Sequence, residues 1–307
     1  MNRSSLTRFA WLSIAAAFIT IALKTGAYLL TGSVGLLSDA LESVVNLIGA
    51  LMALWMLTIA ARPEDESHMF GHSKAEYFSS GVEGSLILIA AGSITFAAIQ
   101  RLLHPQGLEQ VGVGLIVSII ASVINFSVGR ILKGAGKKFN SITLEADSAH
   151  LMTDVWTSVG VISAVFIVSI SKWTLLDPLI ALAVAANIVW TGISLIRKSV
   201  SGLMDAALPV DELSKVEEIL DKYRQRGIQF HAVRTRLSAS RRFISLHILV
   251  PGNMTVHDGH HIAEELEFDL LKLFEEAVIF THLEPIEDEI SSYDILLDRV
   301  KIVKDPE

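Results

Sequence analysis

The sequence predicts a membrane protein with six transmembrane helices, followed by a small α+β domain. Apolar runs long enough to cross a hydrocarbon core of ~30 Å recur between Phe9 and Ile196, and the mean hydropathy of the chain is +0.50. The last hundred residues instead have the charged composition of a soluble domain, with helix and strand periodicity in the order α-β-β-α-β. The predicted domains are therefore 1–207 and 208–307.

Each predicted span is a run of about twenty mostly apolar residues, the length that a helix needs to cross a bilayer. The second and fifth runs are the least apolar, because polar residues occupy their first halves. The six runs are Phe9–Leu30, Leu36–Ala60, Ser80–Leu102, Val111–Leu132, Ile142–Ile170 and Leu175–Ile196.

The C-terminal domain is predicted to be a ferredoxin-like or metallochaperone-like sandwich, with helices on one face of a sheet. Alternating apolar residues indicate strands and a 3.6-residue period indicates helices. The expected helices are Val210–Arg226 and Val256–Phe274, and the expected strands are Gln229–Leu237, Phe243–Val250 and Ala277–His282.

Lys and Arg are unevenly distributed over the ends of the spans. Ten lie at one set of ends and only two, Arg101 and Lys172, at the other. The positive-inside rule then places both termini in the cytoplasm of a cell (plasma or inner) membrane. Residues 208–307 hold 20 acidic residues against 12 Lys and Arg, a net charge of −8 that equals that of the whole chain. Such a domain attracts cations and does not suggest nucleic acid as a partner.

The second and fifth spans carry matching polar faces. Both faces have the spacing i, i+3, i+7, which is one side of a helix; they are Asp39, Glu42 and Asn46, and Asp147, His150 and Asp154. An ionisable residue inside a bilayer costs at least ~2.5 kcal/mol and usually has a function. If the faces meet, they offer a divalent metal one nitrogen and three oxygen ligands, from Glu42, Asn46, His150 and Asp154. The alternative is structural hydrogen bonding between helices.

Two further clusters of metal-binding residue types lie outside the spans. The loop after the second span contains Asp65, His68 and His72, which could hold a metal, although loop histidines are often simply solvated. The C-terminal domain contains five histidines and a carboxylate as candidate ligands, namely His231, His247, His260, His261, His282 and Glu284.

A hairpin register centred on Ala239 pairs His231 with His247 across two strands. The same register pairs Phe230 with Ile248 and Ala232 with Leu246, and these apolar pairs take the face under the helices. Both histidines then point to the open face, as a metal clamp or as part of a dimer interface. Two exposed surface histidines are the alternative.

The sequence gives little support to an enzyme. It has no cysteine, which excludes disulfides, thiolate metal sites and cysteine catalysis. It has no phosphate-binding loop and no nucleophile with a partner base, and we expect no organic cofactor. Glu83 and Asn125, near or within spans, are interpreted as structural hydrogen-bonding residues.

With these residues in view, the chain resembles the cation diffusion facilitator family of metal transporters over nearly its whole length. The matching segments are Leu36–Ser43, Phe70–Glu76, Ala149–Val155, His231–Arg236 and Thr281–Pro285. The resemblance implies a homodimer in the lipid bilayer that exports divalent transition metal from the cytoplasm in exchange for protons, by alternating access.

The resemblance also implies roles for the clustered residues. Glu42, Asn46, His150 and Asp154 would form the transport site, and Asp65, His68 and His72 the loop site. The C-terminal sites would comprise His231, His247, His260, His282 and Glu284. Lys74 and Asp205 fall where the family has a salt bridge near the membrane surface.

Asn46 departs from the family pattern, which usually has Asp at that place. The nitrogen and oxygen ligands suit zinc, but Fe(II), Mn(II), Co(II) or Cd(II) would also be accepted. A metal-sensing membrane protein, whose acidic domain binds metal without any flux, is the second hypothesis.

Overall fold

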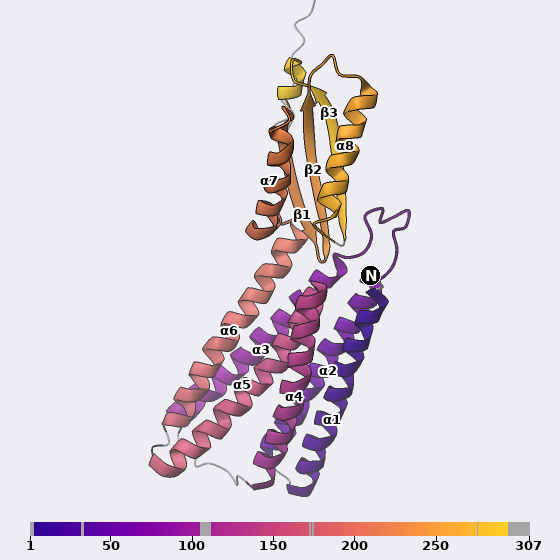
Figure 1. Cartoon of the computed structure of the whole chain (residues 1–307). Coiled ribbons are helices and arrows are strands. Elements are labelled where there is room, and N and C mark those ends of the chain that lie inside the picture. Colours follow the sequence, from indigo (N-terminus) through magenta and orange to yellow (C-terminus); the bar gives the residue numbers. More distant parts are fainter. Residues whose placement is uncertain are drawn as a thin grey trace, which may run out of the picture. The chain divides into compact units, whose positions relative to one another are not determined.

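The computed structural model describes residues 3–31, 34–104, 112–171, 173, 175–274 and 276–293 (Figure 1). It divides into two compact units, residues 2–203 and the chain from Met204 onward. The first is helical and the second contains a sheet.

In the described part of the first unit, six long helices follow one another. They are α1 (Thr7–Thr31), α2 (Val34–Ala60), α3 (Ala75–Leu103), α4 (Gly112–Phe139), α5 (Ile142–Ser171) and α6 (Leu176–Leu203), preceded by a short 3-10 helix, η1 (Arg3–Leu6). Within the described residues, all but α5 are long and apolar enough to cross a membrane. The first half of α5 carries Glu145, Asp147 and Asp154, which lower its hydropathy. The predicted fold class is confirmed.

Several helices extend beyond the predicted spans. Helix α3 begins at Ala75, α4 ends at Phe139 and α6 ends at Leu203, because a helix satisfies its own backbone hydrogen bonds and can continue into water with polar side chains. Val111, the predicted start of the fourth span, lies outside the described residues.

Helix α5 belongs to both apolar cores of the helical unit. Leu144 and Leu151 of α5 pack in one core with Leu57 of α2 and Leu132 of α4. Ala146 of α5 packs in the other core with residues of α3 and α6. The polar side chains of α5 are therefore placed in the interior of the unit.

Helices α3 and α6 approach each other closely at glycines. A Cβ on Gly84 would lie 3.1 Å from the carbonyl oxygen of Gly192, and the reverse distance is also 3.1 Å. Further along, a Cβ on Gly202 would overlap the ring of Tyr77, which is buried. Small residues at a helix crossing let the backbones pack tightly, so α3 and α6 form a close pair.

The buried carboxylate of Glu76 ties the start of α3 to the turn before α5. Ser141 Oγ donates to Glu76 Oε2 at 2.5 Å, and Thr143 Oγ1 donates to the Glu76 carbonyl at 3.2 Å. Asn140 precedes them with φ 49°, a conformation that Asn tolerates better than most residues. These contacts fix where α5 begins. They therefore also fix the position of its polar residues along the helix axis.

The C-terminal unit has the predicted order of elements. It consists of α7 (Val210–Arg224), β1 (Gln229–Ser238), β2 (Arg241–Val250), α8 (Val256–Leu271), β3 (Ala277–Pro285) and a short 3-10 helix, η2 (Glu289–Ser292). The sheet order is β1-β2-β3, with β1 and β2 antiparallel and β2 and β3 parallel. Leu220 of α7 and Leu266 of α8 share one core with Leu246 and Ile248 of β2, so this domain has its own apolar core.

The predicted hairpin register is right at the histidines and wrong nearer the turn. His231 pairs with His247 and Phe230 with Ile248, as expected. Ala232 does not pair with Leu246: it has φ 48°, and the ladder shifts between His231 and Arg234. The turn is centred between Ala239 and Ser240, half a residue beyond the expected centre. The extra residue of the β-bulge compensates for this offset.

We expect Gly202→Ala to destabilise the helical unit, because the added methyl group would overlap the buried Tyr77 ring. Overpacking of this kind costs about 1–3 kcal/mol, more than the ~1 kcal/mol that Ala gains over Gly in a helix. Thermal unfolding of the purified protein in detergent is the measurement. Gly92→Ala is the matched control, since a Cβ there meets nothing within 4 Å. Equal unfolding temperatures for the two variants would contradict the close packing of α3 and α6.

Candidate functional site

A cluster of buried polar side chains occupies the interior of the helical unit, and five helices contribute to it. Its members are Ser13 of α1, Asn46 of α2, Glu83 of α3, Asn125 of α4, and Asp147, His150 and Asp154 of α5. Such groups are costly to bury unless they pair, so their contacts define the site.

The two ring nitrogens of His150 both face oxygen atoms. Nε2 lies 2.6 Å from Asn46 Oδ1, and Nδ1 lies 2.6 Å from Glu83 Oε2. A neutral imidazole has one N–H donor and a doubly protonated one has two. The ring is therefore held between two acceptors, one on α2 and one on α3.

Asp154 is held by two amides. Its Oδ2 accepts hydrogen bonds from Asn46 Nδ2 and from Asn125 Nδ2, the latter at 3.0 Å. Asn46 thus bridges His150 and Asp154, so three of the four predicted ligands from α2 and α5 lie together.

The remaining residues of the two predicted polar faces are placed as follows. Glu42 lies one helical turn before Asn46 on α2 and is half-buried. Asp147 Oδ1 accepts a hydrogen bond from Ser13 Oγ at 3.0 Å, which ties α5 to α1. The side chain of Asp39 lies outside the described part of the structure.

Glu83 and Asn125 complete the surroundings of His150 and Asp154, although the sequence interpretation gave them only a structural role. The signal that could have identified Glu83 is an acidic residue inside a helix that is long and apolar enough to cross a membrane. Asn125 gives a weaker signal, because a single amide in a span costs less to bury than a charge.

The structure brings the predicted loop residues together. The ligand atoms of Asp65, His68 and His72 lie within 4.8 Å of one another, with Asp65 Oδ1 3.2 Å from His68 Nδ1 and Asp65 Oδ2 3.3 Å from His72 Nε2. Partial desolvation favours the protonated form of Asp65, but hydrogen bonds from the backbone N–H groups of His68 and Ser67 hold its pKa below the usual value. An ionised carboxylate between two imidazoles can hold a divalent cation.

In the C-terminal unit, the ligand atoms of His231, His247 and Glu284 also lie within 4.8 Å of one another. His231 Nε2 is 2.7 Å from Glu284 Oε2 and 3.1 Å from His247 Nδ1. His282 Nε2 is 3.5 Å from Glu284 Oε1. The predicted cross-strand pair therefore has a carboxylate from β3 beside it, and the exposed fractions of the two histidine side chains are only 13% and 15%.

His260 is not near this cluster within the single chain. It lies on α8, with 61% of its side chain exposed, and its Nε2 is 3.9 Å from Glu264 Oε1. Its predicted role as a ligand stays a prediction, as does that of His261, whose ring meets the ring of His257 edge-on on the same helix.

The predicted Lys74–Asp205 salt bridge also stays a prediction. Lys74 Nζ donates to the carbonyl oxygen of Leu203 at 3.4 Å, at the end of α6. Asp205 Oδ1 accepts from Arg236 Nη1 at 3.1 Å.

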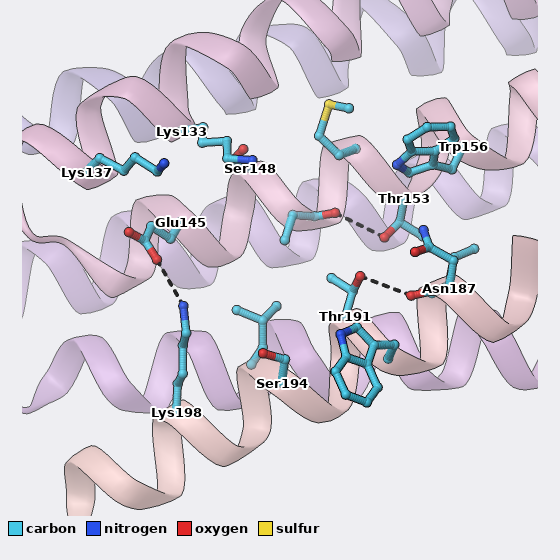
Figure 2. A pocket seen from close by; sticks show the side chains of 15 residues that line it. Lys133, Lys137, Glu145, Ser148, Thr153, Trp156, Asn187, Thr191, Ser194 and Lys198 are labelled. Atoms are coloured by element: carbon cyan, nitrogen blue, oxygen red, sulfur yellow. Dashed lines mark hydrogen bonds and ion pairs between the residues drawn. The ribbon is translucent and has the colours of Figure 1, made fainter. Parts of the chain in front are cut away.

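A cavity of about 510 Å³ lies between α4, α5 and α6 (Figure 2). Lys133, Lys137 and Lys198 line it, and Lys198 pairs with Glu145 at 3.5 Å. Thr153, the neighbour of Asp154, also lines it. None of the predicted transport ligands is among its described lining residues, so the candidate site is the buried cluster and not this cavity.

Comparison with known proteins gives matches over both units. Residues 10–204 match the family model for the cation efflux transmembrane domain, and residues 208–286 match that for the cytoplasmic domain of cation efflux proteins. An uncharacterised transporter of Synechocystis sp. is 51% identical, over 91% of this chain and 90% of its own. A cation-efflux pump of Pectobacterium carotovorum is 32% identical, over 89% of this chain and 90% of its own. One of Klebsiella pneumoniae is 30% identical, over 93% of this chain and 95% of its own.

We expect the isolated C-terminal domain, residues 208–307, to bind zinc through His231 and His247, because they and Glu284 already lie at ligand distances. Calorimetric titration of the domain, which has its own core, is the measurement. The double variant His231→Ala, His247→Ala should lose most of the heat of binding. His257→Ala, which removes an exposed histidine of α8 that is not among the predicted ligands, is the control and should bind like the wild type. Equal binding by the double variant would contradict the assignment.

Proposed function

Since the chain belongs to the cation efflux family, also called cation diffusion facilitators, we propose that it exports divalent transition metals, with zinc as the preferred ion, in exchange for protons. The observation that carries this proposal is the meeting of Asn46, His150 and Asp154 in the interior of a helical membrane domain. One imidazole nitrogen and several side-chain oxygens suit zinc and its neighbours in the first transition row.

The proposed site is made of Glu42, Asn46, His150 and Asp154. Metal binding needs the lone pair of His150 Nε2, the nitrogen that faces the Asn46 oxygen. Metal and proton therefore compete for the same nitrogen, which is the basis of the proposed exchange. Alternating access would expose this site first to the cytoplasm and then to the opposite side.

The proposed topology places both termini and the C-terminal domain in the cytoplasm of a cell membrane. The excess of Lys and Arg at one set of helix ends supports it, as does the match to a cytoplasmic-domain family model. The chain is proposed to act as a homodimer, with the loop cluster and the C-terminal cluster as additional metal sites.

A metal sensor without flux is the second candidate. It is favoured by one observation: the cluster of His231, His247 and Glu284 lies entirely within its own domain. Zinc flux into proteoliposomes under an imposed pH gradient separates the two functions. A transporter accumulates zinc when protons leave the vesicle, whereas a sensor binds zinc and moves none.

We expect Asp154→Ala to reduce zinc flux to that of empty vesicles. The variant removes a charge that the ion needs and leaves the amides of Asn46 and Asn125 without their acceptor. The measurement is the initial rate of zinc uptake into proteoliposomes containing equal amounts of folded protein. Gly92→Ala is the control and should keep the wild-type rate. Substantial flux through Asp154→Ala would remove Asp154 from the site.

We expect Asn46→Asp to keep transport but to change the metal preference and the pH dependence of flux. The new carboxylate cannot donate to Asp154, so two like charges face each other and neighbouring groups bind protons more strongly. An added carboxylate also favours harder ions such as Mn(II) over zinc. Zinc and manganese flux at several pH values is the measurement. An unchanged metal ratio and pH profile would mean that Asn46 is not a ligand.

A further inference from the structure

Glu83 is a buried carboxylate that none of the proposed sites uses. It lies in α3 (Ala75–Leu103), in a stretch of mostly small residues, and its exposed fraction is 0%. Because an ionisable group inside a membrane domain is costly, its contacts need an explanation.

One oxygen of Glu83 is committed to His150. Oε2 lies 2.6 Å from Nδ1, while Nε2 of the same ring faces Asn46. Metal-binding histidines commonly donate their second ring N–H to a carboxylate, which fixes the ring orientation and makes the other nitrogen a better ligand. Glu83 is in the place of such a carboxylate, and it comes from a helix that supplies no proposed ligand.

The other oxygen of Glu83 packs against bare backbone of α2. A Cβ on Gly49 would lie 2.6 Å from Oε1, so only glycine leaves room for the carboxylate there. Oε1 is buried and makes no hydrogen bond to any described residue. A side chain placed only to join helices would be expected to use both oxygens. This one is instead directed by its contact with His150.

We propose that Glu83 is a positioning carboxylate of the transport site, which orients His150 so that Nε2 faces the metal, and that Gly49 provides the space for it. The inference rests on the proposed function, because it assigns a role at the same site. Glu83 acts through His150 and is not itself counted among the ligands.

The experiment compares zinc transport and metal binding in the full-length protein. Since the loop and C-terminal clusters would also bind metal, all variants are made in a background that carries His68→Ala, His231→Ala and His247→Ala. Initial rates of zinc uptake in proteoliposomes give KM and kcat. Cobalt(II) absorption in detergent reports the ligand geometry of the site directly.

Glu83→Gln keeps the volume of the side chain and removes its charge. We expect it to raise the KM for zinc 10- to 100-fold, the usual effect of losing such a partner, and to change the cobalt(II) spectrum. Glu83→Asp, which keeps the charge, should recover part of the affinity. Gly49→Ala should also raise KM, because it displaces the carboxylate, whereas Gly92→Ala should leave KM unchanged.

A double-mutant cycle tests whether Glu83 acts through the imidazole. In a His150→Ala background, Glu83→Gln should cause no further loss of cobalt(II) or zinc affinity. A loss as large as in the presence of His150 would overturn the proposal. An unchanged KM and cobalt(II) spectrum in Glu83→Gln, with the wild type transporting zinc, would also overturn it. Absence of zinc flux in the wild type would instead refute the proposed function, and the binding cycle would still decide the role of Glu83.

Discussion

The helical unit depends on one constraint: its buried charges must find partners from other helices, because the apolar surroundings offer none. The contacts run in a chain from Asn125 to Asp154, Asn46, His150 and Glu83. Each link joins two helices, so the chain connects α4, α5, α2 and α3. Since losing one member leaves a buried group without its partner, this polar chain sets the relative positions of the helices as well as the ligands.

Residues far from the proposed ligands hold this series of polar contacts in place. Glu76 fixes the turn before α5 through Ser141 and Thr143, and so sets the depth at which His150 and Asp154 lie. Gly49 allows the Glu83 carboxylate to approach α2. Helix α3 also packs closely with α6 through small residues, so the contact between Glu83 and His150 joins this pair to α5.

The sequence predicted correctly those features of the structure that depend on local periodicity, namely which residues share a helix face and which strand residues face each other. The i, i+3, i+7 spacing placed His150 and Asp154 on one face of α5, and strand alternation placed His231 opposite His247. Glu83 was underestimated, because its partner lies 67 positions away and helix packing is not visible in a local pattern. The bulge at Ala232 was missed for a related reason: the turn can be centred on or beside Ala239, and only the packing of the strands decides between them.

The three proposed metal sites differ in how they are built, and this difference bears on what each can do. Asp65, His68 and His72 come from one short loop, and His231, His247 and Glu284 come from adjacent strands of one sheet. Their ligands keep their distances as long as the local backbone keeps its shape. Asn46 and His150 come instead from separate helices, and a small shift of one helix past the other would change the ligand geometry. A transporter must bind its ion and then release it. The cluster between helices is therefore the one that suits transport, and the two local clusters suit binding without movement.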